Sequence, residues 1–407
     1  MASRSRMISF GLIGLAIVVV TGLAADAATP QGNVWPYASR HGESGSFTVA
    51  TVGDIACEPA TAENASTPAA LKCSNVGATG NTLGGLPAEF ATAQQAYAMH
   101  PDRVALLGDE QYEVGKLTDF EQSFEQSWGG LKMLERPAPG NHEYYSYTKH
   151  KDNEAGQNGT GYFEYFNGHT QAGTPNSQGQ AGQDTGASQG WYSYNVGSWH
   201  FISLNIECMS QPFNFDCSST DGGLLNQETS WLASDLASND QPCTVAYWHQ
   251  PTFSATTAPS SNLPDPSAPG VGSGEGLAAD AWWKLLYDAH ATLVLNGHEH
   301  VYARFKPMDP SGKFDPKHGI TQITVGTGGE DLDTLARTGS SFDNPNVVTG
   351  QDQAFGVMKL TLKGNSASWS YQPALAGPLA TDPTAAMAYS DSGSVKCQGE
   401  DGNSNDK

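Results

Sequence analysis

Five times in this sequence a β-prone segment ends and a side chain able to bind a metal ion follows shortly after it. These side chains belong to Asp54, Asp109, Asn141, His249 and the pair His298/His300. In α/β proteins, ligands bind beyond the carboxyl ends of strands, where the connecting loops converge. Glycines precede most of these residues, and glycine permits sharp turns and close backbone approach. We therefore expect one site, built at the ends of several strands.

Strand patterns alternate with helix patterns along the chain, which indicates an α/β fold. The β-prone runs cover residues 47–52, 104–107, 191–196, 199–206, 243–248, 291–295, 320–325, 355–362 and 367–371. Helical patterns cover residues 88–99, 224–236 and 277–290. Because neither a repeat nor a sharp change in composition divides the sequence, we expect a lead-in over 28–46, one domain over 47–380, and a loose polar tail over 381–407.

Three other stretches lead to separate predictions. Thr118 is placed to cap a helix whose apolar residues recur three and four apart, from Phe120 to Leu131. Residues 148–190 are rich in Gly, Gln, Asn and Thr, which predicts a long surface insertion. Residues 250–276 contain several prolines and glycines, and this loop is longer than a simple connection requires.

The balance of charge excludes one class of function. Forty-two acidic residues against 20 basic ones give a net charge of −22, so the chain lacks a general basic surface for nucleic acid. An acidic surface also repels phosphorylated macromolecules. Hydrophobic residues make up 38% of the chain, which is ample for a core.

The N-terminus has the three parts of a secretory signal. Arg4 and Arg6 precede an apolar run over 7–23, and Ala25-Asp-Ala27 has the small-x-small form of a cleavage site. An uncleaved membrane anchor is the alternative, but polar and glycine interruptions favour cleavage after Ala27. We expect residues 1–27 to be a signal peptide, the mature protein to be secreted, and no stable anchor to remain.

Six cysteines agree with an oxidising compartment, where pairing is favoured. Short intervening loops favour the pairs Cys57–Cys73 and Cys208–Cys217. No Cys-x-x-Cys sequence is present, which argues against a zinc ribbon or a thioredoxin-like site.

The donor side chains outnumber what one tetrahedral ion can use. With Tyr112, three residues after Asp109, they are two Asp, one Asn, three His and one Tyr. Such a set suits two ions about 3.5–4 Å apart, joined by a carboxylate, an arrangement used in phosphoryl transfer. One aspartate could bridge the ions while the other six donors divide three and three.

Taken in order, these sequence blocks resemble the calcineurin-like metallophosphoesterases. The blocks are Gly53-Asp54, Gly108-Asp-Glu-Gln-Tyr112, Gly140-Asn-His-Glu143, His249 and Gly297-His-Glu-His300. The Gly-Asp-x-x-Tyr form is similar to the purple acid phosphatases and their secreted bacterial relatives. The resemblance covers about residues 47–330 and implies a β-sandwich flanked by helices, in four layers α/β/β/α.

The resemblance also implies a role for each donor. Asp54, Tyr112 and His300 would hold a ferric ion, because a phenolate ligand below its ordinary pKa needs a strongly acidic cation. Asn141, His249 and His298 would hold zinc, manganese or ferrous iron, with Asp109 bridging the two ions.

His142 would face the substrate, stabilise the phosphoryl group and protonate the leaving alkoxide. The implied reaction is hydrolysis of phosphomonoesters by in-line attack of a metal-bound hydroxide, and small phosphorylated substrates suit the acidic surface.

The sequence departs from the family at four places. Ala56 replaces the last glycine of Gly-Asp-x-Gly, and Ala246-Tyr-Trp-His249 stands where Val-x-x-His is more common. Gln250 stands where bacterial relatives often have a second histidine. Ala303 replaces the acid of Tyr-Glu-Arg after His300.

Other interpretations remain open. The same ions serve phosphodiesters or nucleotides, and the loops at 148–190 and 250–276 would decide which ester fits. A non-catalytic binding protein on this scaffold is the remaining alternative. Any one Gly-Asp by itself is a turn, and Gly326-Thr-Gly-Gly329 is either a turn or a backbone loop near the site. Trp282 and Trp283 are expected in the core, and His200 in cross-strand packing.

Overall fold

The structure is a computed structural model of the 407-residue chain. It describes residues 45–59, 88–144, 159–168, 189–207, 223–256, 274–378 and 380–397. The expected signal peptide and most of the lead-in therefore lie outside the described residues, as do Cys73, Cys208 and Cys217 and most of the two long loops. Among the helices that are described, none is both long and apolar enough to cross a membrane.

The first sheet contains strands from both ends of the described chain. Its strand order is β15-β14-β13-β1-β2-β3. The strands are β1 (Ser46–Val52), β2 (Arg103–Leu106), β3 (Glu135–Pro137), β13 (Ala354–Lys363), β14 (Ser366–Ala376) and β15 (Asp391–Lys396). β1, β2 and β3 are parallel, whereas β13, β14 and β15 run antiparallel to their neighbours.

The second sheet has the order β12-β8-β9-β7-β6-β5-β4. The strands are β4 (Tyr192–Val196), β5 (Trp199–Ser203), β6 (Cys243–Tyr247), β7 (Leu293–Asn296), β8 (Tyr302–Met308), β9 (Ile320–Val325) and β12 (Val347–Gln351). The four central strands β5, β6, β7 and β9 are parallel. The antiparallel pairing of β4 with β5 forms a hairpin across Gly197-Ser198. A small hairpin pairs β10 (Arg337–Thr338) with β11 (Ser341–Phe342).

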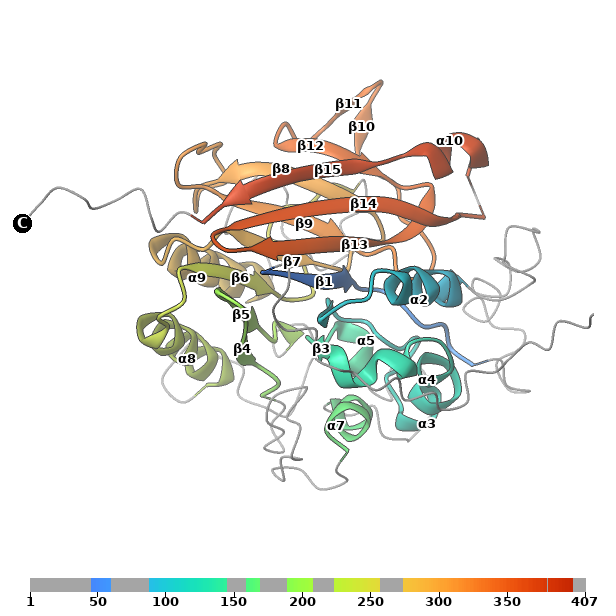
Figure 1. The fold of residues 1–407 in the computed structure, drawn as a ribbon, viewed down its shortest axis with the longest axis horizontal. Coiled ribbons are helices and arrows are strands. Elements are labelled where there is room, and N and C mark those ends of the chain that lie inside the picture. Colours follow the sequence, from blue (N-terminus) through green and yellow to red (C-terminus); the bar gives the residue numbers. More distant parts are fainter. Residues whose placement is uncertain are drawn as a thin grey trace, which may run out of the picture.

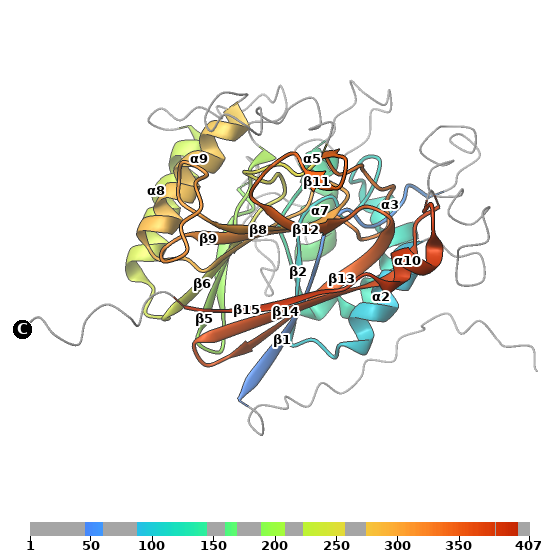
Figure 2. The same ribbon diagram turned by 90° about the horizontal axis from the view of Figure 1, so that it is seen from above.

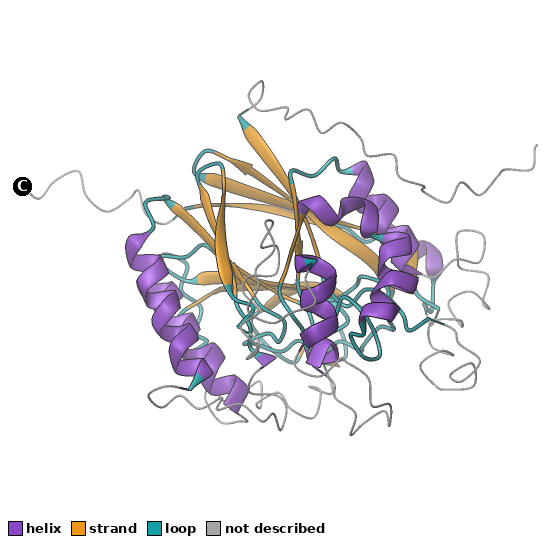
Figure 3. Cartoon of the chain, turned by 90° about the horizontal axis from the view of Figure 1, so that it is seen from below, coloured by secondary structure: helices purple, strands orange, loops and turns teal. Residues whose placement is uncertain are grey.

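Helices lie on both outer sides of the two sheets, and Figure 3 shows the strands between them. The helical segments are α2 (Ala88–Ala98), α3 (Leu117–Asp119), α4 (Glu125–Ser127), α5 (Asn141–Tyr144), α7 (Thr160–Asn167), α8 (Leu224–Ser238), α9 (Gly274–Asp288) and α10 (Pro383–Ala388). In Figure 1, α8 and α9 lie beside the second sheet and α2 to α7 beside the first. The α/β sandwich expected from the sequence is confirmed.

The period of two along a strand explains why these runs form the inside of a sandwich. In and just after β6, Val245 and Tyr247 belong to one apolar cluster, and Ala246 and Trp248 belong to the other. The first cluster contains residues of both sheets, so it is the core between them. The second packs α9, through the buried Trp282 and Trp283, on the outer face of the second sheet. The expected core positions of these two tryptophans are confirmed.

The stretch predicted as one helix capped by Thr118 is irregular. α3 is preceded by Lys116, whose side chain makes no cap bond, and the Thr118 hydroxyl lies 3.3 Å from Asp119 Oδ1 instead. A π-helical turn, η1 (Phe120–Phe124), and a 3-10 turn, η2 (Gly129–Leu134), interrupt the α-helix. The predicted apolar positions are nevertheless buried, so the periodicity predicted the buried face correctly and the cap incorrectly.

Part of the predicted surface insertion belongs to the core. α7 buries Tyr162, Phe163 and Phe166, and the Tyr165 ring stacks on Phe120 at 4.9 Å between centroids. The residues around this short aromatic segment are polar, so composition predicted a surface position for it, and that prediction is wrong.

The expectation of a loose tail is wrong for residues 383–397. They form α10 and then β15, which adds to the edge of the first sheet beside β14. A disulfide joins Cys397 to Cys243 at the start of β6. Asp391 accepts hydrogen bonds from Tyr302 and Trp369. It also forms an ion pair with Arg304, through Nε and Nη2 of the guanidinium. These contacts hold β15 against the second sheet.

The parallel strands of the two sheets bring their carboxyl ends to the same region. β1, β2 and β3 in one sheet and β6 and β7 in the other all end there. Figure 2 labels β2 and β6, one strand from each sheet, in the view from above. The loops that follow these five strands carry the side chains singled out by the sequence.

Candidate metal centre

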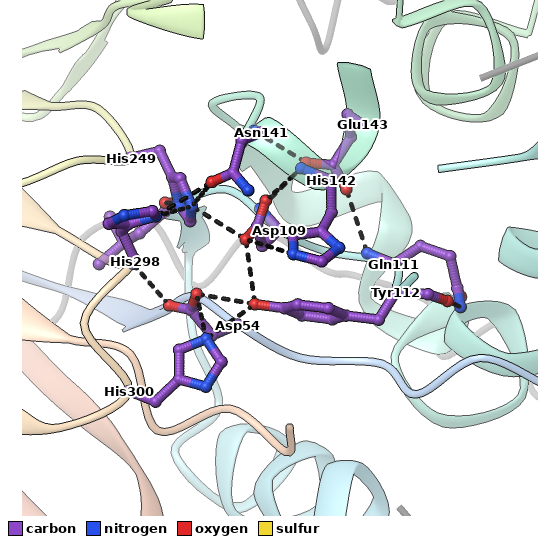
Figure 4. Close-up of polar contacts among 12 residues, drawn as sticks. Asp54, Asp109, Gln111, Tyr112, Asn141, His142, Glu143, His249, His298 and His300 are labelled. Carbon is purple, nitrogen blue, oxygen red and sulfur yellow. Dashed lines mark hydrogen bonds and ion pairs between the residues drawn. The ribbon is translucent and has the colours of Figure 1, made fainter. Parts of the chain in front are cut away.

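Three of the predicted donors form one group (Figure 4). The Tyr112 hydroxyl lies 3.0 Å from Asp54 Oδ1 and 3.0 Å from His300 Nε2, and His300 Nε2 lies 3.2 Å from Asp54 Oδ1. Asp54 follows β1, Tyr112 follows β2 and His300 follows β7, so both sheets contribute. We call Asp54, Tyr112 and His300 the first half-site.

Three other donors form a second group beside it. Asn141 Oδ1 lies 3.1 Å from His249 Nε2 and 3.0 Å from His298 Nδ1, and these two ring nitrogens are 3.1 Å apart. Asn141 begins α5, His249 follows β6 and His298 follows β7. We call Asn141, His249 and His298 the second half-site.

Asp109 stands between the two half-sites. Its Oδ2 lies 3.0 Å from the Tyr112 hydroxyl and 3.0 Å from His249 Nε2. A single carboxylate oxygen therefore contacts one donor of each half-site. The structure thus brings together all seven side chains that the sequence selected as metal donors.

The donor groups fit metal ions in both chemistry and spacing. Metal–nitrogen and metal–oxygen bonds of about 2.1 Å at right angles place neighbouring donor atoms about 3 Å apart. The contacts within each half-site, from 3.0 to 3.2 Å, match this spacing. Donor atoms of Asp109, His249 and His298 all lie within 4.8 Å of one another, a group that could hold an ion. Carboxylate, phenol, amide and imidazole are all ligand types used by iron, zinc and manganese.

Left-handed backbone turns aim several of these side chains. Asp54 has φ of 61°, Asp109 of 50° and His298 of 66°, a region that side-chain-bearing residues seldom adopt. Gly108 has φ of 90°, and a Cβ there would lie 2.5 Å from His249 Nδ1. Such conformations cost free energy and persist where the surroundings enforce them, as they do at functional sites. The glycine before Asp109 is required by this close approach.

The ring nitrogens that face away from the half-sites are also bonded. His249 Nδ1 lies 2.9 Å from the carbonyl oxygen of Leu107, and His300 Nδ1 lies 2.8 Å from that of Asp331. A hydrogen bond from one ring nitrogen to a carbonyl leaves the other nitrogen free of its proton. In both rings the other nitrogen is Nε2, which faces the group of donors.

A buried carboxylate that the sequence analysis did not single out braces two of the loops. Glu143 accepts hydrogen bonds from the backbone N–H of Asp109 at 3.0 Å, of Gly140 at 2.8 Å and of Gln111 at 3.1 Å. It thus joins the loop after β2 to the turn that begins at Asn141. The signal was present in the Gly-Asn-His-Glu block, but the residue type alone does not separate a ligand from a brace.

His142 lies beside the donors without belonging to either half-site. Its backbone N–H donates to Asp109 Oδ1 at 2.8 Å, its Nδ1 lies 2.8 Å from the carbonyl oxygen of Glu113, and its Nε2 is 3.9 Å from Asp109 Oδ2. Its side chain is 14% exposed, so the ring lies at the boundary between the donors and solvent. Burial lowers the pKa of His142 to about 4, although the charge of Asp109 opposes this shift. The ring is therefore neutral above that pH, and an anionic phosphoryl group beside it would raise its pKa.

The two acidic groups that touch each other at the centre respond differently to their surroundings. Burial would raise the pKa of the Asp109 carboxyl, but His249 and His142 bring it below its usual range, which keeps the carboxylate charged. Burial and the charges of Asp109 and Asp54 raise the pKa of Tyr112 well above its usual value. A phenolate at this position therefore requires a cation beside it.

The glycine loop after β9 lies against the first half-site. A Cβ on Gly326 would lie 2.8 Å from Asp54 Oδ2 and 2.1 Å from the carbonyl oxygen of Glu299. The N–H of Gly328 donates to the carbonyl oxygen of Gly53 at 3.0 Å. Of the two interpretations of this loop, close approach to the site is the one the structure supports.

The departures from the family pattern are accommodated. Ala56 is fully buried and pairs with Gln111 in an isolated parallel bridge, where its small side chain fits. Ala303 is buried in β8, and the next residue, Arg304, pairs with Asp391. Gln250 is buried directly after His249. His200 packs as predicted, 2.9 Å from Asn195 on the paired strand.

Comparison with known proteins agrees with this architecture. The family model described as calcineurin-like phosphoesterase matches residues 47–302. Purple acid phosphatase 22 of Arabidopsis thaliana is 29% identical over 185 residues, which are 44% of this chain and 36% of that protein. An uncharacterised protein of Mycobacterium tuberculosis is 29% identical over 238 residues, 53% of this chain and 38% of that protein. The chain thus spans less than half the length of these relatives.

Solved structures share the fold at low sequence identity. A purple acid phosphatase from yellow lupin has a TM-score of 0.55 and 18% identity over 87% of this chain and 54% of that one. GAP50, the anchor in the inner membrane complex of Plasmodium, has a TM-score of 0.51 and 14% identity over 86% of this chain and 88% of that one.

The match of the family model to more than half of the sequence, on this sandwich, places the chain in one class. It belongs to the calcineurin-like phosphoesterase family, and within it resembles the purple acid phosphatases. The predicted membership of this family is therefore confirmed.

Proposed function

We propose that this chain is a secreted phosphatase that binds two metal ions and hydrolyses phosphomonoesters. The observation that carries the proposal is the position of Asp109, whose Oδ2 contacts the Tyr112 hydroxyl on one side and His249 Nε2 on the other. A carboxylate oxygen placed between two sets of donors is what a pair of bridged cations requires.

The seven donors would divide as the half-sites do. Asp54, Tyr112 and His300 would hold one ion, and Asn141, His249 and His298 the other, with Asp109 shared. When bound, the two ions would supply an activated water as nucleophile and positive charge for the phosphoryl oxygens.

The metals we propose follow from the donor types. The first half-site offers a carboxylate and a phenol, whose proton only a strongly acidic cation displaces here, so we assign it ferric iron. The second half-site offers one amide and two imidazoles, all neutral, and suits zinc, manganese or ferrous iron.

His142 is the residue we assign to the substrate. Its ring borders the donors, and the contact of Nδ1 with the Glu113 carbonyl oxygen leaves Nε2 to meet a phosphoryl oxygen or the leaving group. A phosphoryl dianion beside the ring would raise its pKa and let it donate a proton to the leaving alkoxide.

The substrate class and the location are proposed from the sequence. The net charge of −22 disfavours large polyanions, so we propose small phosphorylated molecules. Disulfide bonding of Cys57, and of Cys243 with Cys397, agrees with secretion into an oxidising compartment.

The proposal is tested on protein purified aerobically from full-length chain. Elemental analysis should give two metal ions per chain, and iron bound next to Tyr112 should give a visible absorption band. A nitrophenyl phosphate monoester should be hydrolysed faster than the matching diester. A faster diester would change the proposed substrate class and leave the metal site in place. Colourless protein without iron would replace the ferric assignment with zinc or manganese.

A non-catalytic role is the second candidate, because one protein of similar fold is described as an anchor. The full set of seven donors argues against it. Protein loaded with two ions that hydrolysed neither ester between about pH 4 and pH 9 would favour a binding role.

A further inference from the structure

The loop after β9 surrounds the first half-site over more than its glycines. Beyond Gly326 and Gly328, the N–H of Glu330 donates to the carbonyl oxygen of Asp54 at 3.3 Å. The loop thus follows the backbone of the turn that carries Asp54 and then continues to His300.

Two aspartates at the end of this loop hold His300. The ring Nδ1 of His300 lies 2.8 Å from the carbonyl oxygen and 3.1 Å from Oδ1 of Asp331. The backbone N–H of His300 donates to Asp333 Oδ2 at 2.9 Å, and the N–H of Asp333 donates to the carbonyl oxygen of His300 at 3.2 Å. Ring and backbone of His300 are therefore fixed together, with Nε2 directed at Asp54 and Tyr112.

The second half-site is held differently. His249 Nδ1 meets the neutral carbonyl oxygen of Leu107, and Asn141 begins the short helix α5, in which Glu143 accepts from the backbone N–H groups of Gly140 and Asp109. The outward ring nitrogen of His300 meets a carboxylate as well as a carbonyl oxygen, whereas the contact of His249 Nδ1 is to a carbonyl oxygen.

We propose that Asp331 and Asp333 are positioning residues that orient His300 and add negative charge beside the first half-site, so that it prefers a trivalent cation. This inference rests on the proposed two-ion site. A carboxylate bonded to the far side of a ligand histidine fixes the ring and makes it a stronger donor. Negative charge near an ion also stabilises a trivalent cation more than a divalent one, because the interaction scales with the charge.

Metal binding by the full-length apoprotein tests this inference without an activity assay. Ga³⁺ serves as a trivalent ion and Zn²⁺ as a divalent one, each titrated by calorimetry into wild type and into the double variant Asp331→Asn/Asp333→Asn. Asparagine keeps an oxygen acceptor at each position and removes only the charge. We expect Ga³⁺ affinity to fall about tenfold, the low end of the range for such partners, because both carboxylates are partly exposed. Zn²⁺ affinity should change less than about threefold.

A second variant separates charge from position. Asp331→Ala removes the ring contact at Oδ1. We therefore expect the affinity of the first half-site to fall for Ga³⁺ and for Zn²⁺ alike, while the second half-site is unchanged. Asp288→Asn, which removes a charge paired with Lys284 on α9, is the matched control and should change neither affinity. Circular dichroism verifies folding, and the single variant Asp331→Asn replaces the double variant if the latter does not fold.

Equal losses of Ga³⁺ and Zn²⁺ in the double variant, or no loss of Ga³⁺, would overturn the inference. Failure of the wild type to bind two ions would instead reject the proposed two-ion site, so the two failures are distinguishable.

Discussion

The two half-sites differ in charge although the same sandwich builds both. Asp54 and Tyr112 give the first half-site two groups that can carry negative charge, and Asp331 and Asp333 lie behind its histidine. The second half-site has an amide and two imidazoles, which are neutral groups. Asp109 touches both. One fold can therefore present unlike environments at two adjoining sites, because each strand end contributes its own residue type.

Removing the shared residue should have the largest effect. Asp109→Ala deletes the oxygen that contacts both half-sites, so we expect both ions to be lost and phosphatase kcat/KM to fall by about 10³-fold or more. Metal content and hydrolysis of a nitrophenyl monoester measure the two effects, with Asp288→Asn as the control. Retention of two ions would show that Asp109 does not join the half-sites.

Each half-site can be removed separately. His300→Ala deletes a donor of the first half-site and His298→Ala one of the second, so each variant should keep about one ion. Iron should be lost from the first variant and the other metal from the second. Elemental analysis of the two purified variants gives the answer. If both variants lost the same metal, the division into half-sites would be wrong.

His142 belongs to neither half-site, so its removal should spare both ions. We expect His142→Ala to slow alkyl phosphates, whose leaving group needs a proton, by about 10²-fold or more. Nitrophenyl phosphate, which leaves as a stable anion, should lose much less. Rates for the two esters at equal metal content decide the matter, and equal slowing would contradict an acid role.

A smaller change sharpens the contrast inside the first half-site. Tyr112→Phe keeps the ring and removes the hydroxyl, so the visible band should disappear while hydrolysis falls by about tenfold, less than after loss of an ion. Absorption spectra and metal analysis of the same sample measure both. A band that persisted in this variant would have a source other than Tyr112.

Stability, in place of activity, should respond to a buried acid under the turn of the first half-site. Glu89 accepts the backbone N–H of Cys57 at 3.0 Å, and burial raises its pKa to about 7 from a usual 4.5. The folded protein thus binds a proton that the unfolded chain releases between these values, so stability falls as pH rises through this window.

The variant Glu89→Gln should remove this loss. We expect it to be about 2–3 kcal/mol more stable than wild type at pH 8, with the difference vanishing below about pH 4.5. Urea unfolding of metal-free protein at several pH values tests the sign. A benefit that grew toward low pH would refute the assignment.

The convergence of these side chains could be predicted from the sequence because their pattern follows from topology. Parallel strands must end on the same side, so Asp54, Asp109 and Asn141 had to meet once β1, β2 and β3 lay side by side. The strands, and the burial of Trp282, could be predicted from the spacing of apolar residues along each segment.

What the sequence could not predict depends on partners far along the chain. Glu143 is a brace because three backbone N–H groups happen to face it, and Asp333 matters only because its loop returns to His300. Residues 391–396 are polar and alternate in exposure, so their composition indicated a tail until β14 offered them an edge. Thr118 is not a cap because α3 begins one residue before it, at Leu117, and its hydroxyl contacts Asp119.

The position of β1 has a consequence for how the protein is made. β1 carries Asp54 into place, yet one of its edges pairs with β2 and the other with β13, whose residues are synthesised some 300 positions later. During translation that edge stays open to other chains, as unpaired strand edges do, until residues 354–363 emerge. In a nascent chain interrupted before this point, the turn that carries Asp54 would stand on an incomplete sheet, and the chain would be a substrate for chaperones.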